Sequence, residues 1–244
     1  MQTSISKTNY LFDSIFGPTR NSTSTFLIND NKEISYMDFH IMINQLANVL
    51  IKKGMRVGDR VAVQAEKSNT QIALYAATIK AGGVYLPLNT GYTSSELDYF
   101  IKDSSAKIII VDKNVENIIA KNLDANTVLL TLNSDETGSL TALANEQESF
   151  FDAVERGSDD LAAILYTSGT TGKSKGAILS HQNLLSNTKV LKDYWKFTKE
   201  DVLLHMLPIY HTHGLFVASN LLAYAGGSMI FLPKFDIDQA LKWM

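Results

Sequence analysis

The chain has 244 residues, 45% of them hydrophobic, and a formal net charge of −3. This length allows a substantial core and one or two domains, and the nearly balanced charge argues against a broad nucleic-acid surface. The lack of cysteine excludes disulfides, thiolate metal sites and a cysteine nucleophile. Residues 1–9 have no apolar stretch of signal-peptide length, and Gly226-Gly227 interrupts the apolar run at 215–232. We therefore expect a soluble, cytoplasmic protein without membrane insertion and without a nucleic-acid partner.

Helix and strand patterns alternate over residues 35–132. A helix is expected after Ser35, because Ser35-x-x-Asp38 resembles a capping box and apolar residues follow at helical spacing. The other elements predicted in this region are a strand at 61–65, a helix from Ser68 to Gly82, a helix after Thr93, strands at 107–111 and 127–132, and a helix at 115–122. Repeated alternation of helices with near-continuous apolar strands predicts an α/β fold whose parallel sheet is covered on both faces.

Residues 133–160 differ in composition, with eight acidic residues and Arg156 as their only basic residue. One short helix is expected around 140–151. We interpret this segment as a solvated connector at the end of a first α/β subdomain, residues 1–160. A second subdomain, incomplete within this sequence, is then expected at 161–244. An acidic partner site is the alternative interpretation of the connector.

A Gly-rich segment follows the next apolar run, 161–166. Residues 166–176 contain three glycines, five Ser or Thr hydroxyls and two lysines. A strand that runs into such a turn presents backbone N–H groups to phosphate, and lysines add positive charge. A Walker loop would need glycine at the position of Thr167 and a helix after the loop, whereas Ala177–Leu179 has the pattern of a strand. The segment therefore predicts a strand–loop–strand phosphate clamp; a Walker-type NTPase and a flexible linker are the alternatives.

A second polar cluster, His211-Thr212-His213-Gly214, follows a predicted strand at 202–207. In open α/β sheets, ligands bind at the carboxyl ends of strands. His211 can hydrogen-bond an oxygen on which charge develops; an ordinary loop histidine is the alternative. The His-x-His spacing also occurs in metal sites, but no third ligand is evident nearby. The other histidines are interpreted as surface or structural residues: His40, His181 and His205.

Three segments resemble motifs of the adenylate-forming enzymes, the family of acyl-CoA synthetases, luciferases and peptide-synthetase adenylation domains. Residues 167–176 resemble the family's phosphate loop, with Ser174 in place of the usual proline. Residues 79–88 and 207–214 resemble two further motifs, and the three occur in the order found in the family. The resemblance extends from about Ser35 to the last residue.

The resemblance implies a fold and an activity. The fold is α/β: the N-terminal lobes of the adenylate-forming fold, with mostly parallel sheets flanked by helices, truncated before the family's later motifs. The activity is ATP-dependent activation of a carboxylic acid as an acyl adenylate, followed by transfer to coenzyme A, with ATP, Mg²⁺ and coenzyme A as cofactors. Residues 207–236 are most similar to malonyl-CoA synthetases, which implies malonate as the acid. A synthetase for an apolar acyl or aryl acid and a non-catalytic nucleotide-binding module are the alternatives.

The resemblance also implies roles for individual residues. His211 is the catalytic candidate, because it matches an aromatic-or-histidine position near the reacting carboxylate and the α-phosphate. Thr170 is the candidate for contact with the Mg²⁺ that accompanies ATP. The candidates for ATP phosphate binding are Thr167, Ser168, Gly169, Thr170, Thr171, Gly172, Lys173 and Lys175.

A last helix is expected after Asp236, and its pattern is still running at Met244. The ribose-binding Asp, the Mg²⁺-binding Glu and the late Lys of the family have no counterparts here. We therefore interpret the sequence as an N-terminal portion and expect no synthetase turnover from it alone. Apolar surface that later elements cover in the family should be exposed, which favours self-association.

Overall fold

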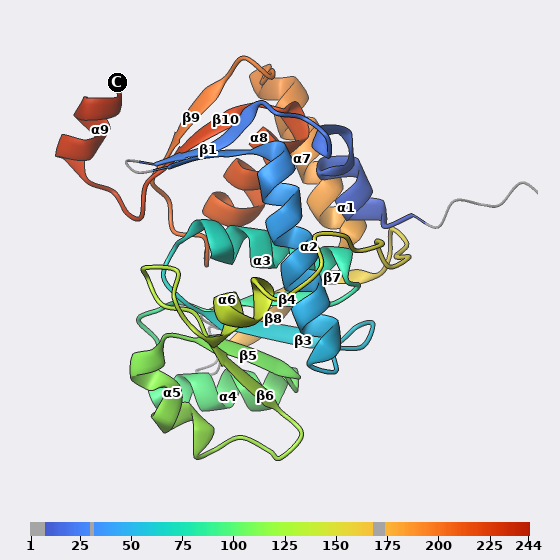
Figure 1. Cartoon of the computed structure of the whole chain (residues 1–244), viewed down its shortest axis with the longest axis vertical. Coiled ribbons are helices and arrows are strands. Elements are labelled where there is room, and N and C mark those ends of the chain that lie inside the picture. Colours follow the sequence, from blue (N-terminus) through green and yellow to red (C-terminus); the bar gives the residue numbers. More distant parts are fainter. Residues whose placement is uncertain (1–7, 30–31, 168–173) are drawn as a thin grey trace, which may run out of the picture.

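The computed structural model describes residues 8–29, 32–167 and 174–244. Figure 1 shows two β-sheets stacked one above the other, with helices between them and on their outer faces. The strands are β1 (Thr25–Asn29), β2 (Lys32–Ser35), β3 (Arg60–Gln64), β4 (Val84–Pro87), β5 (Ile108–Val111), β6 (Val128–Thr131), β7 (Leu161–Thr167), β8 (Lys175–Ser180), β9 (Val202–His205) and β10 (Ser228–Phe231). The helical segments are α1 (Tyr10–Ile15), η1 (Gly17–Thr19), α2 (Tyr36–Lys52), α3 (Asn69–Lys80), α4 (Ser94–Ser104), α5 (Lys113–Ala120), α6 (Ser139–Ala144), α7 (His181–Trp195), the π-helical η2 (His213–Ser219), α8 (Asn220–Ala225) and α9 (Ile237–Trp243).

The larger sheet has six strands in the order β6-β5-β3-β4-β7-β8. All neighbours are parallel except β7 and β8, which form an antiparallel pair. In the central register, Val61 of β3 lies opposite Tyr85 of β4 and Ile108 of β5. Helices α2 and α3 lie on one side of this sheet and α4 and α5 on the other (Figure 1). The predicted α/β fold with a mostly parallel, two-sided sheet is therefore confirmed.

The smaller sheet joins the two ends of the described chain, in the order β2-β1-β10-β9. Leu27 of β1 lies opposite Met229 of β10, and Ser228 lies opposite Val202 of β9. Strands β7 and β8, from the predicted second subdomain, extend the larger sheet, while β1 and β2 belong to the smaller one. None of the helices in the described part of the chain combines the length and apolarity needed to cross a membrane.

Side-chain caps start the helices where the sequence predicts them. The Ser35 hydroxyl accepts a hydrogen bond from Asp38 N at 3.0 Å, and the Ser68 hydroxyl accepts one from Gln71 N at 3.2 Å. Thr93 and Glu96 form a reciprocal capping box at α4. Such a cap satisfies an N–H group that has no partner within the helix and contributes about 1 kcal/mol.

The helix predicted around residues 140–151 is shorter than expected, since α6 ends at Ala144. The following backbone carbonyls are taken by asparagine side chains of α2. Asn44 Nδ2 donates to Ser149 O at 2.7 Å, and Asn48 Nδ2 donates to Phe150 O at 2.9 Å. These hydrogen bonds hold the chain after α6 in an irregular path along α2.

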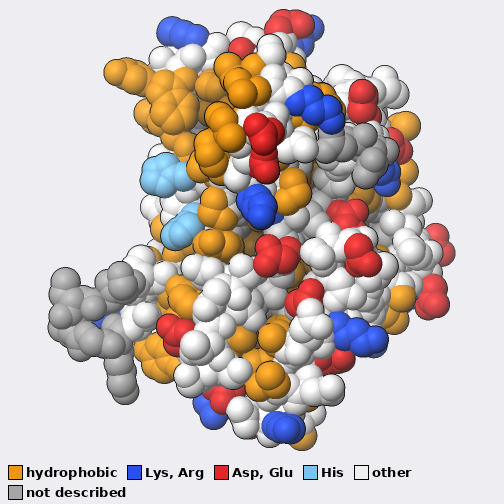
Figure 2. All heavy atoms as spheres, turned by 90° about the vertical axis from the view of Figure 1, so that its left-hand side faces the viewer, with side chains coloured by type: hydrophobic (Ala, Val, Ile, Leu, Met, Phe, Trp, Pro, Cys, Tyr) orange, Lys and Arg blue, Asp and Glu red, His pale blue; other side chains and the backbone are white. Residues whose placement is uncertain are grey.

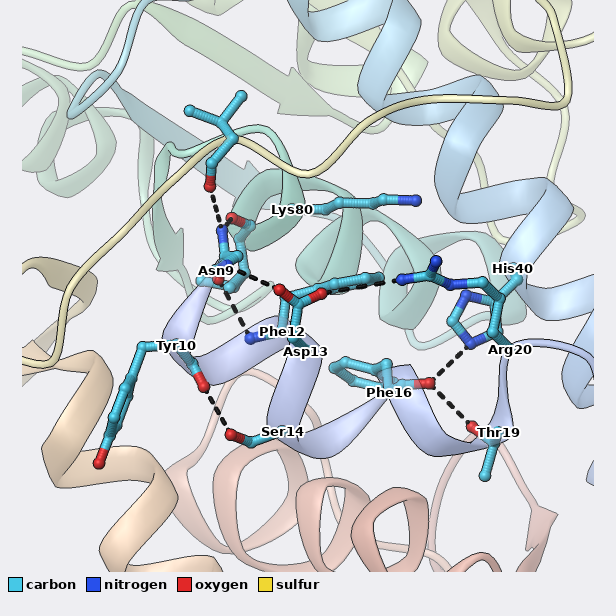
Figure 3. A network of polar contacts seen from close by, with 12 residues as sticks. Asn9, Tyr10, Phe12, Asp13, Ser14, Phe16, Thr19, Arg20, His40 and Lys80 are labelled. Carbon is cyan, nitrogen blue, oxygen red and sulfur yellow. Dashed lines mark hydrogen bonds and ion pairs between the residues drawn. The ribbon is translucent and has the colours of Figure 1, made fainter. Parts of the chain in front are cut away.

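The N-terminal helix α1, which the sequence patterns do not predict, is held by buried polar contacts (Figure 3). The amide of Asn9 donates to Ile79 O at 2.8 Å and to Val154 O at 2.9 Å, which joins α1 to α3 and to the connector. Its carbonyl oxygen accepts from Phe12 N at 3.1 Å and so caps α1. One residue therefore starts this helix and also attaches it to the core.

Three histidines are buried in this core. His40, His181 and His205 are at most 3% exposed. The Nε2 atom of His40 lies 3.0 Å from Phe16 O and donates to it, while the Nδ1 atom of His181 accepts from Leu11 N at 3.3 Å. Burial is the main cause that lowers the pKa of each imidazole to about 4. Of the two roles that the sequence leaves open for these histidines, the structure shows the structural one.

Acid should destabilise the fold through these histidines. Their pKa is about 4 in the folded state against an ordinary value of 6.5. The unfolded chain therefore takes up protons first as the pH falls below 6.5, and each histidine contributes about 3 kcal/mol that is lost by pH 4. The measurement is the free energy of unfolding in urea between pH 7.5 and 4. The His40→Gln variant keeps an N–H donor but cannot be protonated, so its stability should fall less steeply with acid. The exposed His213→Gln variant is the control, and an unchanged slope in His40→Gln contradicts the prediction.

Candidate functional site

The predicted phosphate-binding segment lies between β7 and β8. Thr167 is the last residue of β7, Lys175 is the first of β8, and the two are partners in the antiparallel register. Both are exposed. The other predicted phosphate ligands lie outside the described residues: Ser168, Gly169, Thr170, Thr171, Gly172 and Lys173. A strand rather than a helix follows this segment, which agrees with the predicted clamp and differs from a Walker loop.

A close approach of the two strands explains one of the glycines. Gly176 lies opposite Tyr166 in the register of β7 and β8. A Cβ atom at Gly176 would lie 2.9 Å from Ile164 Cγ2 and 3.5 Å from the ring of Tyr166. Any larger residue would push the strands apart at the base of the loop, so Gly176 serves strand packing.

Helix α4 holds both ends of the loop. The Tyr99 hydroxyl donates to Ser174 O at 2.9 Å, directly before β8. The Tyr166 hydroxyl donates to Asp103 Oδ2 at 2.5 Å, directly before the end of β7. The Tyr166 ring also packs on Phe100, with ring centroids 4.4 Å apart. Burial, and then the hydrogen bond and charge of Asp103, raise the pKa of Tyr166, so its hydroxyl stays protonated and donates at neutral pH.

The His211-Thr212-His213-Gly214 segment follows the carboxyl end of β9. His211 and His213 are exposed, unlike the other three histidines, and Figure 2 shows exposed histidine side chains on one face of the molecule. The ring of Tyr210 lies beside that of His211, with centroids 5.0 Å apart. Gly214 is buried, and a Cβ atom there would lie 2.2 Å from Pro208 O, so only glycine fits. The segment continues into η2, a π-helix of a kind that is frequent at functional sites.

Tyr92 contacts helix α4. Tyr92 packs on Phe100 with ring centroids 4.8 Å apart, and Phe100 in turn contacts Tyr166. Burial raises the pKa of Tyr92, with smaller contributions from Glu96 and from the nearby phenol of Tyr210. Tyr210, which precedes His211, therefore lies in the neighbourhood of Tyr92.

Metal chemistry has no further support from the described residues. Across residues 8–29, 32–167 and 174–244, no group of three His, Asp or Glu side chains is placed to hold an ion. The donors at the base of the loop, the Thr167 hydroxyl and the Lys175 ammonium, suit phosphate oxygens. Thr170, the predicted contact to Mg²⁺, lies outside the described residues.

A separate hollow of about 590 Å³ lies between α1, α2 and residues 150–153. Arg20 on its wall pairs with Asp13 at 3.8 Å (Figure 3), and Lys80 donates to Asn44 Oδ1. Asp152 also lines the hollow. The carboxylates of Asp13 and Asp152 balance the charges of Arg20 and Lys80, so the hollow favours neither anionic nor cationic ligands. None of the predicted site residues lines this hollow.

Sequence reasoning finds the loop and the His211 segment but misses the residues that support them. Tyr99 and Asp103 contact residues 75 and 63 positions away in the chain. The capping box of α4 predicts the helix that carries them, but no local pattern in the sequence indicates their distant partners.

Comparison with known proteins identifies what this arrangement resembles. Residues 18–244 match the family described as AMP-binding enzyme, so the match begins earlier than Ser35. The structure of apo MatB from Rhodopseudomonas palustris has a TM-score of 0.93 and 51% sequence identity, over 96% of this chain and 47% of MatB. The ATP-bound structure of the same protein has a TM-score of 0.91.

Two curated relatives carry the name malonate–CoA ligase. The protein from Arabidopsis thaliana is 34% identical over 189 residues, which cover 76% of this chain and 31% of the relative. The mitochondrial ACSF3 protein from Xenopus laevis is 26% identical over 223 residues, which cover 88% of this chain and 38% of the relative. The chain thus spans about a third of the length of these relatives and about half of MatB.

Removing the hydroxyl of Tyr99 should loosen the base of the loop. Tyr99→Phe keeps the ring that packs on Phe100 but loses the donor to Ser174 O, a hydrogen bond that contributes about 1 kcal/mol. Amide hydrogen exchange, read by mass spectrometry, should be faster in peptides that span residues 166–180. Tyr194→Phe is the matched control, because the Tyr194 side chain is exposed on α7. Unchanged exchange in Tyr99→Phe would contradict the role of the Tyr99 hydroxyl in holding the base of the loop.

Proposed function

Because this chain belongs to the AMP-binding enzyme family, we propose that it supplies the ATP-binding part of an acyl-CoA synthetase. That enzyme activates a carboxylic acid as an acyl adenylate, with release of pyrophosphate, and passes the acyl group to coenzyme A. The observation that carries the proposal is the β7–β8 pair around a Gly-rich, Lys-containing loop, in a chain whose fold matches ATP-bound MatB.

The first chemical step requires placement and charge neutralisation rather than a strong base. A carboxylate is already ionised near neutral pH and can attack the α-phosphate as it stands. The residues proposed to bind the phosphates are Thr167, Ser168, Gly169, Thr170, Thr171, Gly172, Lys173 and Lys175. Their N–H, hydroxyl and ammonium donors offset the charge that develops on pyrophosphate. Mg²⁺ bound with ATP, through Thr170 in this proposal, supplies further neutralisation of the phosphate oxygens.

His211 is proposed to orient the reacting carboxylate. Its exposed imidazole follows the carboxyl end of β9, where a ligand of an open α/β sheet binds. A ring N–H can donate to a carboxylate oxygen or to the α-phosphate as charge moves between them. Its neighbour Tyr210 limits the directions that the ring can take.

Malonate is the proposed acid. Both relatives named malonate–CoA ligase support this choice, since each aligns with more than three-quarters of the chain. The alternative within the class is an apolar acyl or aryl acid. The second carboxylate of malonate requires a cationic partner, so substrate preference distinguishes the two.

The function can be tested in a chimera in which this chain replaces the matching part of R. palustris MatB. We expect ATP-dependent consumption of coenzyme A, with kcat/KM higher for malonate than for methylmalonate, acetate or octanoate. Lys173→Ala should lower the rate roughly 30- to 1,000-fold, about 2–4 kcal/mol of transition-state stabilisation. Lys189→Ala, on the exposed side of α7, is the control. A preference for octanoate would reject malonate, and an unchanged rate in Lys173→Ala would reject the role of the loop lysine.

We also propose that the 244-residue chain associates with itself through an apolar face. Phe235 and Leu241 are 68% and 65% exposed, and Figure 2 shows apolar side chains gathered on this side of the molecule. Large exposed apolar patches favour association. Sedimentation velocity should show a concentration-dependent dimer or larger species, and the double change Phe235→Glu with Leu241→Glu should shift it to monomer. A monomer at every concentration contradicts this proposal without affecting the proposed chemistry.

A further inference from the structure

Lys67 lies between the end of β3 and Ser68, the residue that caps α3. Its side chain crosses to the smaller sheet. The Nζ atom donates to His205 O at 2.8 Å, lies 2.8 Å from His205 Nδ1, and sits 4.2 Å from the centre of the Phe231 ring. No ion pair joins it to a carboxylate within the described residues. This half-buried ammonium therefore uses its donors on the last residue of β9.

The contacts of His205 fix which nitrogen carries its proton. The Nε2 atom lies 2.9 Å from Gly214 O, and a carbonyl oxygen can only accept, so Nε2 holds the hydrogen. The Nδ1 atom then has a free lone pair, which accepts from Lys67. Burial, followed by the charge of Lys67, lowers the pKa of His205 to about 4, so the ring stays neutral. Donation thus runs in one direction, from Lys67 through His205 to the carbonyl of Gly214.

Gly214 ends the His211-Thr212-His213-Gly214 segment, so the relay ends at the candidate site. Its carbonyl also accepts from the Ser219 hydroxyl at 2.8 Å, and Leu215 N donates to His211 O at 3.0 Å. The Cβ-free backbone at Gly214 packs against Pro208 O. His205 and Ser219 thus both donate to Gly214 O, which restricts the orientation of this turn.

We propose that Lys67 is a positioning residue: acting through His205, it holds Gly214 and thereby the direction in which His211 faces the substrate. The ordering of the turn stands on the contacts alone. Its consequence for catalysis rests on the proposed function of His211.

The protonation state of Lys67 should change how strongly it orders the Gly214 turn through His205. Burial lowers the pKa of Lys67 to about 7. A hydrogen bond from an ammonium is about twice as strong as one from a neutral amine. The other charged groups around Lys67 are Lys32, Asp135 and Glu136, which line the same cavity of about 380 Å³. The turn should therefore be held more firmly below neutral pH than above it.

The first test uses NMR and hydrogen exchange on the 244-residue chain. In the wild type, the nitrogen shifts of His205 should report the Nε2–H tautomer with a hydrogen-bonded Nδ1, and the Nδ1 shift should titrate near pH 7 with Lys67. Lys67→Met fills a similar volume without a donor. It should abolish the titration and speed amide exchange at Leu215 by about tenfold. Lys67→Arg, which restores a cationic donor, should recover most of the protection.

The second test places the same variants in the MatB chimera. Lys67→Met should lower kcat with little change in KM for ATP, and Lys67→Arg should restore much of it. Unchanged exchange at residues 211–219 in Lys67→Met overturns the proposal, whereas the tautomer of His205 should persist because Gly214 O sets it. If that variant does not fold, the wild-type spectrum decides: His205 nitrogen shifts that report a proton on Nδ1, or an Nδ1 without a hydrogen bond, overturn it equally. Altered exchange in a chimera with no synthetase activity would leave the positioning role and reject the proposed function.

Discussion

The arrangement depends on one buried helix. All twelve residues of α3 are buried, because the larger sheet lies on one side of it while η2 and α8 pack on Tyr75 (Figure 1). A helix enclosed in this way must satisfy its polar groups internally. The Thr78 hydroxyl donates back to Leu74 O at 2.8 Å, and the Tyr75 hydroxyl accepts from Asn220 on α8 at 3.1 Å. The second of these contacts also joins α3 to α8.

Each end of α3 is attached to a different part of the chain. At its start, the segment Lys67-Ser68 joins the larger sheet to the last residue of β9. At its end, the carbonyl of Ile79 accepts from Asn9, and the ammonium of Lys80 lies 5.1 Å from the Phe12 ring centre. Contacts at its two ends thus connect α3 with the N-terminal elements and with the last residue of β9.

Local signals in the sequence predict the elements well, whereas pairing over long distances does not follow from them. Caps at Ser35, Ser68 and Thr93 place α2, α3 and α4 correctly, because a cap is a contact over three residues. The pairing of Ile28 with Ile230 joins residues about two hundred positions apart, and the short strand β1 carries no signal of its partner. The same reasoning accounts for α1, whose attachment depends on single buried polar side chains such as Asn9 rather than on an apolar period.

The same contrast between local signals and distant contacts applies to the candidate site. The residues predicted to bind ligands form contiguous motifs, but the residues that support these segments are isolated polar side chains in apolar surroundings. Lys67 and His205 illustrate why such residues carry information. A half-buried ammonium and a buried imidazole both lose hydration, and their replacement by apolar residues of similar volume is often neutral or stabilising. A Lys–His pair at this point is therefore poorly explained as a source of stability. It is well explained as a device that fixes one carbonyl, because only a directional donor can select a single position for Gly214 and the turn that precedes it.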